Sequence, residues 1–250
     1  MSLQKLPSIL AIDCATEILS IGLSTSCADE KNLHASVAGE PQKYFFEADA
    51  GQRHSELLID ATANLINIAG IKKSDIDIFA CMEGPGSFTG LRIGFSAVKG
   101  FALALGKKIV PVPTLDCIAL PFNGFNGLVI PAIDAKQKHF FASLFYKGER
   151  LCAYLDISAQ NLSELIIEHN VNNTVILCGN GACLLETAIK PLLSEFNIFT
   201  DPAFRSGRAS LMLKYIEKKY IMNCSDLKSF EGSTCCAPIY VRAPIKTHAP

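Results

Sequence analysis

The sequence predicts an α/β protein of two lobes, each a mixed sheet flanked by helices. A unit of apolar strand, aspartate, polar turn and second strand occurs at residues 8–24 and again at 128–146, when Asp13 is aligned with Asp134. Stretches with helical spacing of apolar residues follow strands in both halves. The turn-rich segment 121–127 predicts a boundary between a first lobe, 1–121, and a second, 122–250. One large domain with a chance likeness of two hairpins is the alternative.

Composition narrows the class of protein. The chain has 250 residues, and 49% of them are hydrophobic, which is enough to form a core. Its formal net charge of −1 gives no overall electrostatic attraction to nucleic acid or anionic membrane. Its ten cysteines are spread out with no Cys-x-x-Cys pair, and we expect no secretory signal. These features predict a cytoplasmic protein with reduced thiols, and they assign no role to the adjacent Cys235 and Cys236.

The first lobe begins with the hairpin 8–24 and continues with a strand around 44–47. Residues 53–69 have apolar side chains at helical spacing, and Gly70 ends that helix. An apolar strand then runs to Met82.

Residues 88–105 form a helix that is apolar on every side, with Arg92 and Lys99 as its charges. All faces of such a helix have to be buried against other parts of the protein or against a partner. Either the sheet and the preceding helix bury it fully, or part of it is a subunit interface, and we favour the interface.

Between Met82 and this helix, Gly84-Pro85-Gly86-Ser87 makes a sharp turn. The glycines allow unusual backbone angles, and a helix N-terminus after glycines is a ready anion site. A purely structural turn is equally compatible with this pattern. A Walker A loop is excluded because the lysine is absent, and the glycine spacing is one residue too long for the dinucleotide fingerprint.

The rest of the chain alternates short strands and helices. A strand at 107–113 and a short helix at 114–120 close the first lobe. After the second hairpin we expect strands at 151–157 and 173–178, helices at 161–169, 182–194 and 209–220, a Gly-Asn-Gly turn at 179–181 and an extended tail at 238–244 that returns toward the first lobe.

The sequence contains only some of the residues that a nucleotide or metal site of this fold needs. Two-lobed folds of this kind place an aspartate at each hairpin bend for a metal and small residues for phosphates. The first bend has Asp13 and Thr16, whereas the second replaces the small residues with Lys136 and other long side chains, so its nucleotide site is degenerate. A metal pair on the first helix would need His54 and a ligand four residues later, but that residue is Leu58.

With these residues laid out, the chain resembles the TsaB (YeaZ) family, which is required for making threonylcarbamoyladenosine in tRNA. The motifs that carry the resemblance extend from one end of the chain to the other: ILAIDCAT at 9–16, RHSELL at 53–58, GPGSFTGLRIG at 84–94, PAIDA at 131–135 and YVR at 240–242. Glu83 and Lys136-Gln137 depart from the family pattern, which usually has Arg before Gly-Pro-Gly and Arg-Met at the second bend.

The resemblance implies an actin-like, sugar-kinase-like (ASKHA) fold and a non-catalytic relative of TsaD. TsaD keeps two metal-binding histidines on the equivalent first helix and transfers the threonylcarbamoyl group to the adenosine beside the anticodon. The implied partners are a TsaD-like catalytic subunit, a TsaE-like ATPase, tRNA through the complex, and a second copy of the chain when the partner is absent. No membrane is implied. The competing class is an enzyme of the same fold, either a small-molecule kinase or a glycoprotease-like peptidase.

Two sets of site residues follow, and neither includes a catalytic residue or a metal ligand. The implied interface lies on the first-lobe helices, and a weakly bound nucleotide such as ATP or ADP at the partner interface is the only cofactor expected. The interface residues are His54, Leu57, Leu58, Ala61, Phe88, Leu91, Arg92, Phe95 and Val98, and the candidate anion or nucleotide residues are Asp13, Thr16, Gly84, Gly86 and Ser87.

Overall fold

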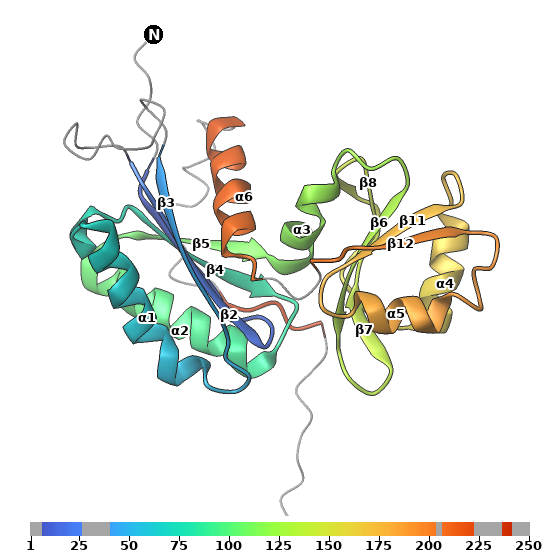
Figure 1. Ribbon diagram of the computed structural model, residues 1–250, viewed down its shortest axis with the longest axis horizontal. Coiled ribbons are helices and arrows are strands. Elements are labelled where there is room, and N and C mark those ends of the chain that lie inside the picture. The colour runs from blue at the N-terminus through green and yellow to red at the C-terminus, as the bar shows by residue number, and fades with distance from the viewer. Residues whose placement is uncertain (1–6, 27–40, 204–206, 223–236, 242–250) are drawn as a thin grey trace, which may run out of the picture. The chain divides into compact units, whose positions relative to one another are not determined.

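The chain folds into two compact units, each built on its own sheet (Figure 1). The structure is a computed structural model, and it describes residues 7–26, 41–203, 207–222 and 237–241. The pair Cys235-Cys236 lies outside these residues.

The first unit has a five-stranded sheet with the order β3-β2-β1-β4-β5. Strands β1, β2 and β3 are antiparallel neighbours, and β4 runs parallel to β1. The strands are β1 (Ile9–Asp13), β2 (Ile18–Thr25), β3 (Gln42–Asp49), β4 (Ile78–Gly84) and β5 (Lys108–Pro113).

Strand β2 shows how the sheet receives helices on both faces. Leu19, Ile21 and Leu23 belong to a core that they share with α1 (His54–Ala69) and α2 (Phe88–Leu105). The intervening Ser20, Gly22 and Ser24 face α6 (Ala209–Met222). Large apolar residues therefore alternate with small or polar ones, and Figure 1 shows α1 and α2 on one side of the sheet and α6 on the other.

The second unit repeats the arrangement with the order β10-β7-β6-β11-β12 and a small β8–β9 pair beside β6. Helices α4 (Ala159–Glu168) and α5 (Ala182–Ile189) cover one face, and α3 (Thr114–Ala119) with the following 3-10 turn η3 (Leu120–Phe122) packs on the other. The strands are β6 (Leu128–Asp134), β7 (His139–Ala142), β8 (Phe145–Tyr146), β9 (Glu149–Arg150), β10 (Leu155–Ser158), β11 (Thr174–Cys178) and β12 (Asn197–Thr200).

The repeated hairpin is present in both units. Strands β1 and β2 pair antiparallel with Asp13 at the end of β1, and β6 pairs antiparallel with β7 with Asp134 at the end of β6. The helices expected at 53–69 and 88–105 also form, and Gly70 ends the first with a left-handed cap.

The units do not divide at residue 121 as the turn-rich segment suggests. Helix α3 belongs to the second unit, because Leu115 and Ile118 pack with Val129 and Ile133 of β6. Helix α6 belongs to the first unit although it follows the whole of the second in sequence. The chain therefore returns to the first unit at residue 207, whereas the described start of the tail groups with the second unit and stacks Tyr240 on Phe88, with 4.9 Å between ring centroids.

Helix α2 is long and apolar enough to pass a test for a membrane span by length and composition alone. A helix that packs into the core of a globular unit passes the same test, and Phe95, Val98 and Ala102 of α2 belong to the first core.

Candidate functional site

The bend between β1 and β2 holds the candidate residues Asp13 and Thr16 in the interior of the first unit. The Asp13 side chain is fully buried, and its Oδ1 accepts the backbone N–H of Ala15 at 2.8 Å. Thr16 is also buried, and its Oγ1 accepts the N–H of Ile18 at 3.4 Å. Both side chains thus serve the local turn.

Two other buried ionisable residues influence the Asp13 carboxylate. Burial raises its pKa, and this effect is opposed by the charge of Arg208, by hydrogen bonds from the backbone N–H groups of Ala15 and Arg208, and by His54. Among the described residues, Oδ2 of Asp13 and Nε2 of His54 are buried without a hydrogen-bond partner. Arg208, buried at the start of α6, is a residue that no local sequence pattern connects with Asp13, because it lies 195 positions later.

The neighbouring Cys14 is equally enclosed. Burial, with the charge of Asp13 and the proximity of Cys81, raises the pKa of its thiol. A thiol that stays protonated in the core is a poor nucleophile, so this cysteine packs as a small apolar residue.

At the second bend, Asp134 lies at the surface of the second unit and finds its partners within the bend itself. The Lys136 ammonium lies 2.7 Å from Oδ2 of Asp134, and the backbone N–H of Lys136 donates to Oδ1 at 2.8 Å. Residues 136–138 all have positive φ, and their side chains are long. Both oxygens of Asp134 are therefore engaged by its own chain.

The Gly84-Pro85-Gly86-Ser87 corner is a tight connection whose first amide is already used. Gly84 has φ +111° and donates its N–H to Oγ1 of Thr114 at 3.2 Å. Gly86 is half-buried and Ser87 exposed. The five candidate anion residues are split between the two units, since Asp13 and Thr16 fall in the first and the three corner residues in the second.

The Gly179-Asn180-Gly181 turn packs against its own unit. A Cβ on Gly179 would lie 2.5 Å from the carbonyl oxygen of Ala132, and one on Gly181 would lie 2.8 Å from the N of Asp134. Gly181 also donates its N–H to Ala132 at 3.0 Å. Close packing against β6 is the reason for glycine at both positions.

Helix α1 places His54 and Leu58 one turn apart, and both are buried. In the part of the chain that the structure describes, no group of three or more His, Cys, Asp or Glu side chains is arranged to hold a metal ion.

Burial differs among the nine residues of the expected interface. Six of its nine residues are buried in the first unit, where Leu58, Ala61, Phe95 and Val98 form part of the core and His54 and Leu91 are also enclosed. A side chain packed in its own core is not available to a partner. Leu57 and Phe88 are half-buried, and Arg92 is exposed.

The large apolar side chains that α1 and α2 expose are not among the nine expected interface residues. Ile59 is 52% exposed and Ile68 71% on α1, and Leu103 is 83% exposed on α2. The signal was present in the periodicity, since residues adjacent to a buried stripe point away from it. On α2, Leu103 belongs to an exposed stripe with Arg92, Ser96 and Gly100.

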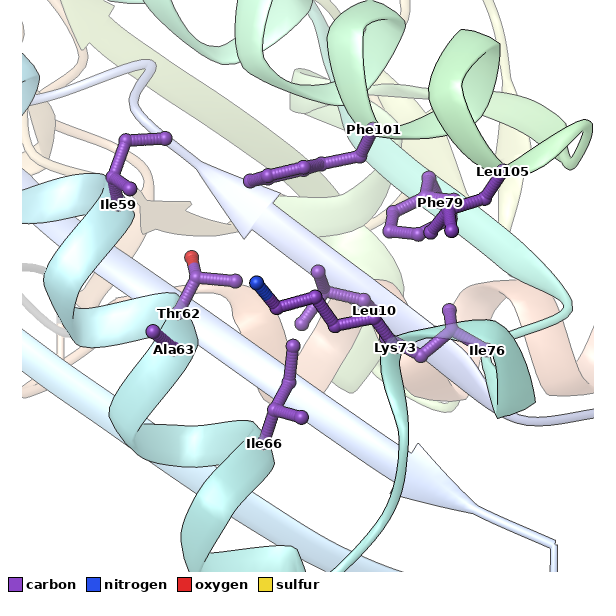
Figure 2. A pocket seen from close by; sticks show the side chains of 10 residues that line it. All are labelled: Leu10, Ile59, Thr62, Ala63, Ile66, Lys73, Ile76, Phe79, Phe101 and Leu105. Carbon is purple, nitrogen blue, oxygen red and sulfur yellow. The ribbon is translucent and has the colours of Figure 1, made fainter.

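An apolar pocket of about 50 Å³ opens between α1, α2 and the sheet (Figure 2). Lys73, from the 3-10 turn η2 (Lys73–Asp75), supplies the charged side chain of the lining. The other lining residues are Leu10, Ile59, Thr62, Ala63, Ile66, Ile76, Phe79, Phe101 and Leu105. Apart from Lys73 and Thr62 the lining is apolar, which suits an aliphatic side chain and not the phosphates of a nucleotide.

Known proteins share this pattern of sequence and structure. The family model of tRNA N6-adenosine threonylcarbamoyltransferase, TsaD, matches residues 46–172. The tRNA threonylcarbamoyladenosine biosynthesis protein TsaB of Bacillus subtilis is 31% identical over 163 residues, which cover 64% of this chain and 70% of that protein. The chain belongs to the TsaB (YeaZ) family.

Other TsaB proteins and TsaD transferases are more partial matches. TsaB of Escherichia coli is 29% identical over 56% of each chain. A tRNA N6-adenosine threonylcarbamoyltransferase of Jannaschia is 34% identical, but the match covers 44% of this chain and only 29% of the transferase.

A solved structure agrees with the fold. YeaZ from Pseudomonas aeruginosa has a TM-score of 0.65 and 19% identity, with 94% of this chain and all of that chain covered. The TsaB-family chain thus has the predicted two-lobed ASKHA-like architecture of helix-flanked mixed sheets.

Proposed function

We propose that this TsaB-family chain is a non-catalytic scaffold subunit in the formation of threonylcarbamoyladenosine in tRNA. It pairs with a TsaD-like catalytic subunit and activates transfer of the threonylcarbamoyl group to the adenosine beside the anticodon. A TsaE-like ATPase joins the assembly, tRNA is reached through the complex, and the chain pairs with itself when the partner is absent. The site of action is the cytoplasm.

The position of Leu58 carries the proposal. The resemblance to TsaD implies that a transferase holds its metal with two histidines one turn apart on the first helix. Here the second position is Leu58, which is buried in the core with no capacity to bind a metal. The chain therefore keeps the helix of the transferase without its metal chemistry.

The two bend aspartates argue against a kinase of the same fold. Asp134 is paired with Lys136, and Asp13 is enclosed near Arg208, so each carboxylate already has a cation of its own chain as neighbour. A metal–nucleotide complex would have to compete with both. A weakly bound ATP or ADP at the partner interface remains part of the proposal as a ligand of the complex.

The surface of α1 and α2 is where we place the partner. Ile59 is exposed and lines the apolar pocket between the two helices, and Leu103 exposes a large apolar side chain on α2. Exposed apolar side chains beside an apolar pocket are typical of a protein-binding surface.

Reconstitution tests the function. The TsaD-like and TsaE-like proteins of the same organism are mixed with unmodified tRNA, threonylcarbamoyl donor and ATP, and modified adenosine is measured by mass spectrometry with and without this chain. We expect product to fall to background when the chain is left out. Undiminished product without it would contradict a scaffold role, and product formed by this chain alone would show an enzyme.

A further inference from the structure

We propose that the bend at Asp13 is the docking site of the chain's own helix α6, and that this helix closes the bend to a metal–nucleotide complex. The bend residues and α6 are separated by almost the whole second unit in sequence, yet both belong to the first unit.

Hydrogen bonds from the start of α6 end on the hairpin. The first backbone N–H groups of a helix have no partner within the helix and need one elsewhere. Arg208 stands at the cap position, because its carbonyl accepts the N–H of Met212 at 2.8 Å. Its own N–H donates to the Asp13 carboxylate, and the N–H of Ala209 donates to Oγ of Ser20 at 3.3 Å. Asp13 and Ser20 therefore cap α6 from a distant part of the chain.

Charge favours the same contact. A carboxylate at a helix N-terminus is stabilised by the positive end of the helix dipole. The side chain of Arg208 adds its positive charge, and it is buried as Asp13 is. A buried carboxylate needs such neighbours, because burial of an isolated charge is strongly unfavourable.

The packing surfaces of the hairpin and of α6 fit closely. A Cβ on Gly22 would lie 3.2 Å from both Ala209 Cβ and Leu213 Cδ1, and a Cβ on Gly207 would lie 2.5 Å from Ser20 Cβ. One turn further along, Lys43 pairs with Glu217 at 2.7 Å. The helix is therefore held along β2 and β3 as well as at its cap.

Docking of α6 and metal binding would both use the Asp13 carboxylate, whose Oδ2 is buried without a hydrogen-bond partner in the described part of the chain. A bound metal needs carboxylate oxygens that water or phosphate can reach, but Asp13 is fully buried beneath this contact. Magnesium–nucleotide binding at Asp13 would consequently require α6 to leave. The aspartate retained at this position serves as a helix cap.

Hydrogen exchange with mass spectrometry tests the docking in the full chain. Asp13→Ala removes the acceptor, Asp13→Asn keeps a carbonyl oxygen, and Asp134→Ala is the matched control in the other hairpin. We expect Asp13→Ala to speed exchange in residues 207–219 about tenfold, as loss of a helix cap does, while α5 stays unchanged. Asp134→Ala should leave residues 207–219 as in the wild type. Asp13→Asn keeps an acceptor but loses the charge, so it should speed exchange there less than Asp13→Ala does. Unchanged exchange there in a folded Asp13→Ala variant would overturn the proposal.

A second measurement needs no variant that alters folding. The wild-type chain is titrated with Mg-ATP by calorimetry, and exchange of residues 207–219 is followed at each concentration. We expect either no uptake, or uptake accompanied by faster exchange in α6. The closure would be refuted if the wild type binds Mg-ATP while α6 stays fully protected, and if Asp13→Asn abolishes that binding. This result would show that the bend binds the nucleotide with the helix in place.

Discussion

Asp13 and Asp134 occupy equivalent positions in the two hairpins and have opposite surroundings. Asp13 is fully buried beside the start of α6, whereas Asp134 is partly exposed and paired with Lys136. The strands that lead to them are alike, so the difference comes from what covers each bend. One aspartate caps a helix and the other closes a surface turn.

Burial of Asp13 predicts a pH dependence of stability. Burial raises the pKa of Asp13 above its ordinary value of 3.8, so the folded state binds the proton more tightly than the unfolded state. The contribution of this group is therefore most favourable below pH 3.8 and declines as pH rises through the raised pKa. In Asp13→Asn this dependence is absent, and the side-chain carbonyl still accepts a hydrogen bond.

We expect the free energy of unfolding of Asp13→Asn, relative to wild type, to increase as pH rises above 3.8 and to level off once the pH exceeds the raised pKa of Asp13. Urea unfolding of both proteins at a series of pH values measures it, and the other titrating groups cancel in the difference. A difference independent of pH would contradict the assignment of the raised pKa to Asp13.

At the scale of elements, glycines decide how closely segments approach in both units. Gly22 lets α6 lie against β2, and Gly179 and Gly181 let the turn before α5 lie against β6. The Gly-Asn-Gly turn is open to two interpretations in the sequence, an approach to adenine or a local turn. Its position against the backbone of Ala132 and Asp134 identifies it as a packing device of the second unit.

Gly181→Ala should therefore destabilise the second unit by about 1–3 kcal/mol, because the added methyl would press on backbone that has no side-chain freedom to move away. Thermal unfolding measures the loss. Gly124→Ala is the matched control, since a Cβ there meets nothing within 4 Å. Equal midpoints for the two variants would show that the turn tolerates a side chain.

At the scale of the whole molecule, the proposed association with a TsaD-like subunit would use side chains that the first core does not bury. Charged substitutions at Leu91 or Phe95 would test folding, since both are buried. Ile59 and Leu103 are exposed and therefore test the surface itself.

We expect Ile59→Asp combined with Leu103→Asp to weaken association with the TsaD-like subunit by at least about tenfold, because charges would be buried without partners. Size-exclusion co-elution and calorimetry measure it. Leu184→Asp, at an exposed leucine of α5 in the second unit, is the control. Wild-type affinity in the double variant and loss in the control would place the contact on the other unit.

The sequence alone predicted the two long helices of the first unit, the repeated hairpin and the family. Periodic apolar residues predicted α1, and a long apolar run without proline predicted α2. The repeated strand-aspartate-turn unit predicted two sheets, and the glycine corner was located between strand and helix. These are local patterns, set by neighbours in the chain, so one sequence carries them.

Only the tertiary structure decided which elements share a core. It moved α3 to the second unit and α6 to the first, and it showed that six expected interface residues are buried in the first unit. It also joined Asp13 to Arg208. Apolar residues at helical spacing predict that one face of a helix is buried. Whether a sheet, a distant helix or a partner buries that face depends on contacts between remote parts of the chain.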